Sequence, residues 1–158
     1  MIRTLFTAAC SLVLAAGLHA QDAKEAPPIR EVILKPDNAN PLAYDPTSKT
    51  FTVKVGEKFK VTLENKATIP QPHNLLICKP GSLQKVGAAA NGMLTDPQAM
   101  AKDYVPESPE VLHHTKLVQP GQSESLEITA PSEPGDYVYL CTFPGHWILM
   151  NGIMKVEK

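Results

Sequence analysis

The sequence predicts an all-β protein, an antiparallel β-sandwich of about eight short strands. Several segments alternate apolar and polar residues with the period of two that half-buried strands show. Turn-forming residues separate these segments, and the chain holds 15 prolines in 158 residues. This length suits one domain with its own core. The net charge of −1, without a basic run, argues against nucleic acid as a partner.

The first twenty residues have the pattern of a secretory signal peptide. Arg3 gives a positive start, residues 5–17 are an apolar run, and cleavage is expected after Ala20. The run is too short for an ordinary membrane-spanning helix, so we expect a periplasmic mature protein without a membrane span, with retention of the segment as an anchor as the less favoured alternative. Residues 21–28 are typical of a flexible lead-in, and residues 29–158 form the predicted domain.

The clearest strand signals lie on either side of Gly56. Apolar residues occupy alternate positions of 51–55 and again of 59–63. Alternation on both sides of a glycine-containing turn predicts an antiparallel hairpin. The other predicted strands cover residues 29–35, 75–79, 115–118, 123–129, 136–141 and 152–157.

Residues 82–104 interrupt the strand pattern with an alanine-rich, methionine-containing insertion. Asp96 as N-cap and Pro97 at the first helical position predict a short helix there. The strand before the insertion is apolar on both faces, so both faces need cover. We therefore expect a short helical flap that packs over Leu76 and Cys78.

The loop from Cys141 to Met150 carries the most chemistry. It places a thiolate, an imidazole and a thioether within ten residues, at Cys141, His146 and Met150. Pro144-Gly145 supplies the turn that would bring them together. Such soft donors suit copper better than magnesium or calcium. We interpret the loop as three sides of a mononuclear copper site, with zinc or half of a disulfide as the alternatives.

The remaining cysteine and histidines leave alternatives open. An oxidising compartment could join Cys78 to Cys141, although a metal thiolate at Cys141 and a buried free thiol at Cys78 are preferred. His73 begins a buried strand and is the preferred fourth ligand; a core histidine without a metal is its alternative. His113 and His114 lie in a polar stretch that is typical of a surface pair.

The loop also resembles a known family. Cys-Thr-Phe-Pro-Gly-His at 141–146, with Met150 four residues beyond, is similar to the ligand loop of azurins and auracyanins, which are blue copper cupredoxins. The resemblance extends over most of residues 43–158, including Pro-His-Asn at 72–74 and Lys-Asp-Tyr at 102–104. It implies a Greek-key cupredoxin sandwich around one copper ion that cycles between Cu(I) and Cu(II).

Carried over by residue, the resemblance implies copper ligation by His73, Cys141, His146 and, weakly and axially, Met150. Azurins have a glycine before the first histidine, whereas this chain has Pro72, so we expect a four-coordinate site. The disulfide that azurins carry between the first strand and the hairpin turn has no counterpart here.

Residues beside the ligands are expected to support the site. Asn74 could tie its strand to Thr142 by hydrogen bonds, and the Phe143 amide could donate to the ligand sulfur. Tyr137 is either a tyrosine corner or an ordinary core tyrosine.

A closed ligand set without a nearby acid or base predicts a soluble electron carrier rather than an enzyme. We expect a monomer with His146 exposed at the tip of the loop as the electron port. Pro144, Gly145, Trp147 and Ile148 would form an apolar docking patch for redox proteins, unless Trp147 packs inward.

Two other functions remain open. A periplasmic copper-binding or delivery protein would hold the metal without cycling electrons. A redox enzyme such as a copper nitrite reductase or a multicopper oxidase would need a further copper centre, for which the sequence offers no second ligand set.

Overall fold

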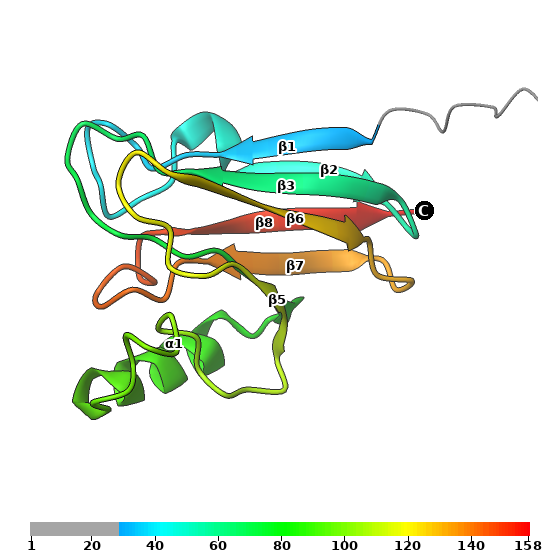
Figure 1. Cartoon of the computed structure of the whole chain (residues 1–158). Helices are drawn as coiled ribbons and strands as arrows, with labels where there is room; N and C mark the ends of the chain where they lie inside the picture. The colour runs from blue at the N-terminus through cyan, green and yellow to red at the C-terminus, as the bar shows by residue number, and fades with distance from the viewer. Residues whose placement is uncertain (1–28) are drawn as a thin grey trace, which may run out of the picture.

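The structure is a computed structural model that describes residues 29–158 and consists of two packed β-sheets (Figure 1). The predicted signal peptide and lead-in lie outside the described residues. One sheet has the strand order β1-β3-β6 and the other β2-β8-β7-β4-β5. Their bounds are β1 Arg30–Leu34, β2 Thr50–Lys54, β3 Lys58–Glu64, β4 Leu76–Pro80, β5 Val111–His114, β6 Ser123–Thr129, β7 Gly135–Leu140 and β8 Asn151–Glu157. The predicted eight-stranded β-sandwich is confirmed, but it is mixed rather than wholly antiparallel, because two of its strand pairs are parallel.

The predicted hairpin is wrong. The strands β2 and β3 follow one another across Gly56, which has a φ of 70°, but they belong to different sheets. β2 pairs in parallel with β8, whereas β3 pairs in parallel with β1 and antiparallel with β6. Alternation identifies which side chains point inward, and both strands do point toward a shared core. Alternation does not identify the partner strand to which β2 or β3 is hydrogen-bonded.

The main core lies between the two sheets. Phe59, Val61 and Leu63 of β3 are fully enclosed and face buried side chains of the other sheet, among them Tyr139. Tyr44, from the irregular segment after β1, is also fully buried and meets Tyr139 edge to face with ring centroids 5.2 Å apart. Each such side chain contributes about 1.5–3 kcal/mol by burial. This core supports one face of β4, the strand that follows His73.

A second cluster covers the outer face of the larger sheet. The insertion folds into α1 (Leu83–Gly92) and a short 3-10 helix, η2 (Met93–Thr95), beside the sandwich (Figure 1). Val86 of α1 packs with Leu76 and Cys78 of β4, which confirms the predicted flap. The α-helix begins earlier in the chain than predicted, at Leu83 rather than after Asp96. Asp96 Oδ1 accepts the Gln98 N–H at 2.8 Å in a turn, a local bond that resembles a helix cap.

The fifth strand also differs from its prediction. β5 spans Val111–His114 rather than 115–118. Thr115 follows β5 and is bonded to Leu75 twice: its hydroxyl accepts the Leu75 N–H and its own N–H donates to the Leu75 carbonyl, both at 2.9 Å. Val118 forms an isolated bridge with His73. Segment 115–118 therefore does not form a strand; its two ends are hydrogen-bonded to His73 and to Leu75.

Two smaller alternatives are resolved. Tyr137 donates its hydroxyl to the Glu133 carbonyl at 3.0 Å, four residues upstream, as a tyrosine corner does. Cys78 and Cys141 are both free and buried, so they form no disulfide.

Within the described residues no helix has the length and apolar character to cross a membrane.

Candidate metal centre

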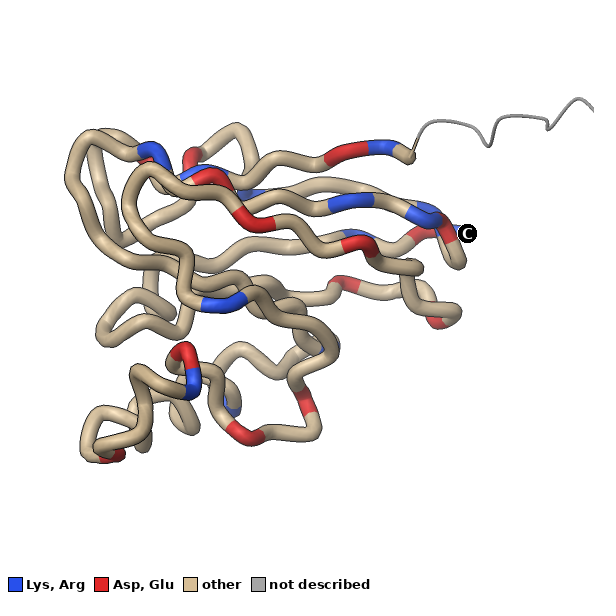
Figure 2. Tube along the Cα trace, viewed as in Figure 1, with Lys and Arg blue, Asp and Glu red and all other residues tan. Residues whose placement is uncertain are grey.

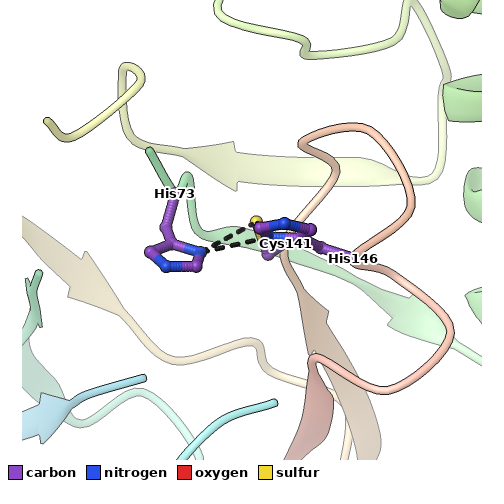
Figure 3. Close-up of side chains that lie close together, drawn as sticks. All are labelled: His73, Cys141 and His146. Atoms are coloured by element: carbon purple, nitrogen blue, oxygen red, sulfur yellow. Dashed lines mark hydrogen bonds between the residues drawn. The ribbon is translucent and has the colours of Figure 1, made fainter. Parts of the chain in front are cut away.

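Three donor atoms converge at one end of the sandwich (Figure 3). The loops that precede β4 and β8 meet at the end of the molecule opposite the C-terminus (Figure 1). Cys141 Sγ lies 3.8 Å from His73 Nδ1 and 3.6 Å from His146 Nδ1, and the two nitrogens are 3.2 Å apart. In the described chain these three residues are the group placed to hold a metal ion.

The triangle has the size of a metal site. A point equidistant from three atoms with these separations lies about 2.1 Å from each, and zinc, a comparable ion, takes imidazole nitrogen at about 2.0 Å and thiolate sulfur at about 2.3 Å. Two imidazoles and one thiolate in a trigonal arrangement are the donor set of electron-transfer copper. The residues present therefore fit a copper ion.

Backbone hydrogen bonds hold each donor in place. His73 exchanges two bonds with Val118, at 3.1 and 2.7 Å. The Cys141 N–H donates to the Met150 carbonyl at 2.9 Å, which closes the base of the ligand loop. At its tip Gly145 has a φ of 81°, and the His146 carbonyl accepts the Met150 N–H at 2.8 Å. The predicted turn at Gly145 thus brings His146 back over Cys141.

Burial controls the charge of the donors. His73 and Cys141 are fully buried and His146 is 2% exposed. Desolvation lowers the pKa of His73 and of His146 to about 4 and raises the pKa of Cys141 to about 12. Both imidazoles are therefore neutral at pH 7, as metal ligands must be. The thiol keeps its proton until a bound cation compensates the thiolate charge.

The prediction that His146 is exposed at the loop tip is therefore wrong. The Phe143 ring packs edge to face against it, with ring centroids 5.0 Å apart, and the His73 ring lies at the same distance. The turn folds the imidazole inward instead of presenting it to solvent.

Asn74 links the two ligand-bearing segments. Its Oδ1 accepts the Thr142 N–H at 2.7 Å, and its Nδ2 donates to Thr142 Oγ1 at 2.9 Å. The backbone N–H groups of Asn74 and Phe143 also approach the thiol and oppose the rise in the pKa of Cys141. The bonds between Asn74 and Thr142 and the approach of the Phe143 amide were expected from the sequence, whereas the approach of the Asn74 amide was not. The two amides stabilise a thiolate at Cys141.

Comparison with known proteins agrees with this geometry. Residues 30–157 match the model of the copper binding proteins of the plastocyanin/azurin family. The chain belongs to this family. It is 33% identical over 124 residues to an azurin of Achromobacter denitrificans, covering 77% of this chain and 76% of the relative. It is 30% identical over 117 residues to auracyanin-A of Chloroflexus aurantiacus, covering 73% and 68%.

A solved structure of dithionite-reduced auracyanin from the photosynthetic bacterium Roseiflexus castenholzii is similar to this cupredoxin over its whole fold. The two share 37% sequence identity with a TM-score of 0.67, over 81% of this chain and 97% of that one. With the family established, copper rather than zinc is the cofactor of the site formed by His73, Cys141 and His146.

The remaining predicted residues of this cupredoxin lie as follows. Met150 is fully buried in the same cluster as Cys141. Trp147 is half-buried, and its Nε1 donates to Asn91 Oδ1 of α1 at 3.0 Å, so it packs against the flap. His113 and His114 lie on β5, outside the donor group.

Two residues that support the site were not predicted to do so. The carbonyl of Asp103 accepts the Asn74 Nδ2–H, and the carbonyl of Tyr104 accepts the Thr142 hydroxyl, both at 2.7 Å. Every residue has a main-chain carbonyl, so the sequence does not show which carbonyls accept these bonds. Both residues also lie in the flap, which was expected only to cover β4. Their match to the family's Lys-Asp-Tyr was the available signal.

Proposed function

We propose that this cupredoxin is a small electron carrier that moves one electron at a time between redox partners. The observation that carries the proposal is the buried triangle of His73 Nδ1, His146 Nδ1 and Cys141 Sγ, already closed to metal-binding size. When bound, copper supplies the one-electron exchange between Cu(I) and Cu(II). The protein supplies a frame that holds the donors in one geometry, so that little rearrangement accompanies the transfer.

Met150 is proposed as the weak axial ligand. Its side chain is fully enclosed in the core cluster that contains Cys141. Its backbone is hydrogen-bonded to the backbones of both Cys141 and His146. Pro72 precedes the first histidine, and we expect no fifth ligand from its carbonyl. Four protein ligands leave no open position for a substrate, which supports a carrier rather than an enzyme.

The proposed docking surface is the outer face of the ligand loop. Ile148 and Leu149 are 63% and 49% exposed, Gly145 is exposed, and Pro144 is half-buried. No charged residue occurs between Cys141 and Met150, and the loop carries no coloured segment at the left of Figure 2. Exposed apolar side chains beside a redox centre suit brief contacts with redox proteins. Trp147 contributes less to this patch than expected, because it packs against α1.

The cellular setting is also part of the proposal. A signal peptide over residues 1–20 would deliver the chain to the periplasm, where we expect a monomer that meets its partners by diffusion. Because the patch is uncharged, the rate at which the protein associates with a redox partner should depend only weakly on ionic strength.

Cyclic voltammetry of the copper-loaded protein tests electron transfer. A reversible one-electron wave, absent from Cys141→Ser, is expected. Metal transfer to an acceptor without a redox step, together with an irreversible wave, would instead favour copper delivery.

Electron exchange with a redox partner protein tests the patch. Ile148→Asp should slow the second-order rate about tenfold by adding a charge to the apolar surface. Leu112→Asp, at a 37% exposed position on β5, is the matched control and should leave the rate unchanged. Equal rates for wild type and Ile148→Asp would remove the patch from the proposal.

A further inference from the structure

Two adjacent residues of the flap adopt an uncommon backbone conformation. Among the described residues, Asp103 and Tyr104 are the only non-glycine residues with positive φ, at 54° and 53°. Asp is one of the few residues that visits this left-handed region readily, whereas for a bulky side chain such as Tyr it is an outlier. Such strain persists where the surrounding structure over-determines it, often at functional sites.

The left-handed turn directs two carbonyls at the metal centre's supports. The Asp103 carbonyl accepts the Asn74 Nδ2–H and the Tyr104 carbonyl accepts the Thr142 hydroxyl, both at 2.7 Å. Asn74 follows the ligand His73 in the chain, and Thr142 follows the ligand Cys141. The strained turn therefore fixes both ends of the bridge that joins the two ligand-bearing segments.

The Asp103 side chain reaches a third segment. Its Oδ1 accepts the Leu117 N–H at 2.8 Å. Leu117 precedes Val118, the residue that exchanges two backbone hydrogen bonds with His73. Asp103 thus contacts the chain on both sides of His73, through Asn74 and through segment 117–118.

We propose that Asp103 is a positioning residue of the copper centre. It touches neither ligand nor metal; it locks the separation of His73 from Cys141 through Asn74, Thr142 and Leu117. A side-chain acceptor and tolerance of the left-handed conformation are both needed, and Asp combines them. The inference rests on the proposed copper site for its effect on the metal, but the structural lock itself exists without copper.

Three variants separate these roles. Asp103→Asn keeps the acceptor oxygen and the left-handed preference, whereas Asp103→Gly keeps only the backbone freedom. Asp96→Gly is the matched control, because Asp96 bonds Gln98 at 2.8 Å and Lys102 at 3.1 Å in the same flap, away from the ligand-bearing segments.

Cu(II) affinity, measured by competition with a chelator, should fall about tenfold in Asp103→Gly, the lower end of the range for residues that support metal ligands. The Cu(II) electron paramagnetic resonance spectrum should shift with it. Asp103→Asn and Asp96→Gly should stay within about twofold of wild type. Equal losses in Asp103→Gly and Asp96→Gly would overturn the proposal, because general loosening of the flap would then explain both.

Amide hydrogen exchange of the copper-free protein gives an independent readout. The Leu117 amide of the wild type should be protected, and Asp103→Gly should expose it while Asp96→Gly does not. Rapid exchange of this amide in the wild type would overturn the proposal even if Asp103→Gly failed to fold. If the protein bound no copper, the proposed function would fail, while the exchange experiment would still decide whether Asp103 holds this lock.

Discussion

The two buried cysteines occupy contrasting regions of the molecule. Cys141 lies in the core between the sheets and Cys78 lies in the cluster under the flap, and both are fully enclosed with a pKa raised to about 12. Their burial is equal, but their neighbours are not. Cys141 faces two imidazole nitrogens within 3.8 Å, whereas Cys78 packs against apolar side chains.

This difference shows that burial alone does not make a ligand. At Cys141 the backbone N–H groups of Asn74 and Phe143 partly oppose the cost of a thiolate, whereas at Cys78 the charge of Glu110 adds to it. The surroundings of Cys141 suit a thiolate that binds a cation, whereas the surroundings of Cys78 are ordinary apolar core.

The largest expected effect separates the two cysteines directly. Cys141→Ala should lower Cu(II) affinity by at least about 100-fold, since it removes the charged ligand rather than a residue that supports one. Cys78→Ala should leave copper affinity unchanged and lower the free energy of unfolding by about 1 kcal/mol through lost packing. Chelator competition and urea unfolding measure the two quantities. A comparable loss of affinity in Cys78→Ala would break the contrast.

The histidines give the next effect, on the stability of the copper-free protein. Their pKa is about 4 when folded and 6.5 in an unfolded chain, so between these values the unfolded state binds more protons. Stability should therefore be retained above pH 6.5 and fall as the pH drops toward 4, by on the order of 3 kcal/mol for each histidine.

Urea unfolding between pH 7 and 4 measures this dependence. The copper-loaded protein is the control, because metal-bound imidazoles cannot take the proton, and its stability should fall less until copper dissociates. Equal pH dependence with and without copper would contradict the assignment of these histidines to the site.

A smaller effect tests whether the flap supports the ligand loop. A Cβ added at Gly87 of α1 would lie 2.4 Å from Cδ2 of Trp147, whereas one at Gly92 would meet nothing within 4 Å. Gly87→Ala should therefore cost about 1–3 kcal/mol of unfolding free energy by displacing Trp147. Gly92→Ala should change it by less than about 1 kcal/mol. Unfolding curves and Trp147 fluorescence distinguish the two; identical behaviour would show that Trp147 moves aside freely.

The sequence predicted the local chemistry of this protein well. The spacing of Cys141 and His146 around a Pro-Gly turn indicates copper because these two donors are close in the chain. Met150 as the axial ligand stays a prediction. His73 followed from a strand that is apolar on both faces, which also identified the flap over Leu76 and Cys78. The Asn74 bridge was expected for the same reason, as it adjoins a ligand.

The errors concern features that depend on three-dimensional context. Alternation cannot tell that β2 and β3 separate into different sheets, because both pairings bury the same side chains. The Asp96 turn resembles a helix cap locally, while α1 begins earlier, at Leu83, without a side-chain cap bond. The burial of His146 depends on how the turn folds against Phe143, and sequence places it only at the tip.

The most direct test of the central account is the visible spectrum of the Cu(II)-loaded protein, with Cys141→Ser and Cys78→Ser beside it. A thiolate held at Cys141 with His73 and His146 predicts intense absorption, blue or green, in the wild type and in Cys78→Ser, and its loss in Cys141→Ser. A colourless Cu(II) protein, or colour that survives in Cys141→Ser, would contradict the copper site described for this cupredoxin.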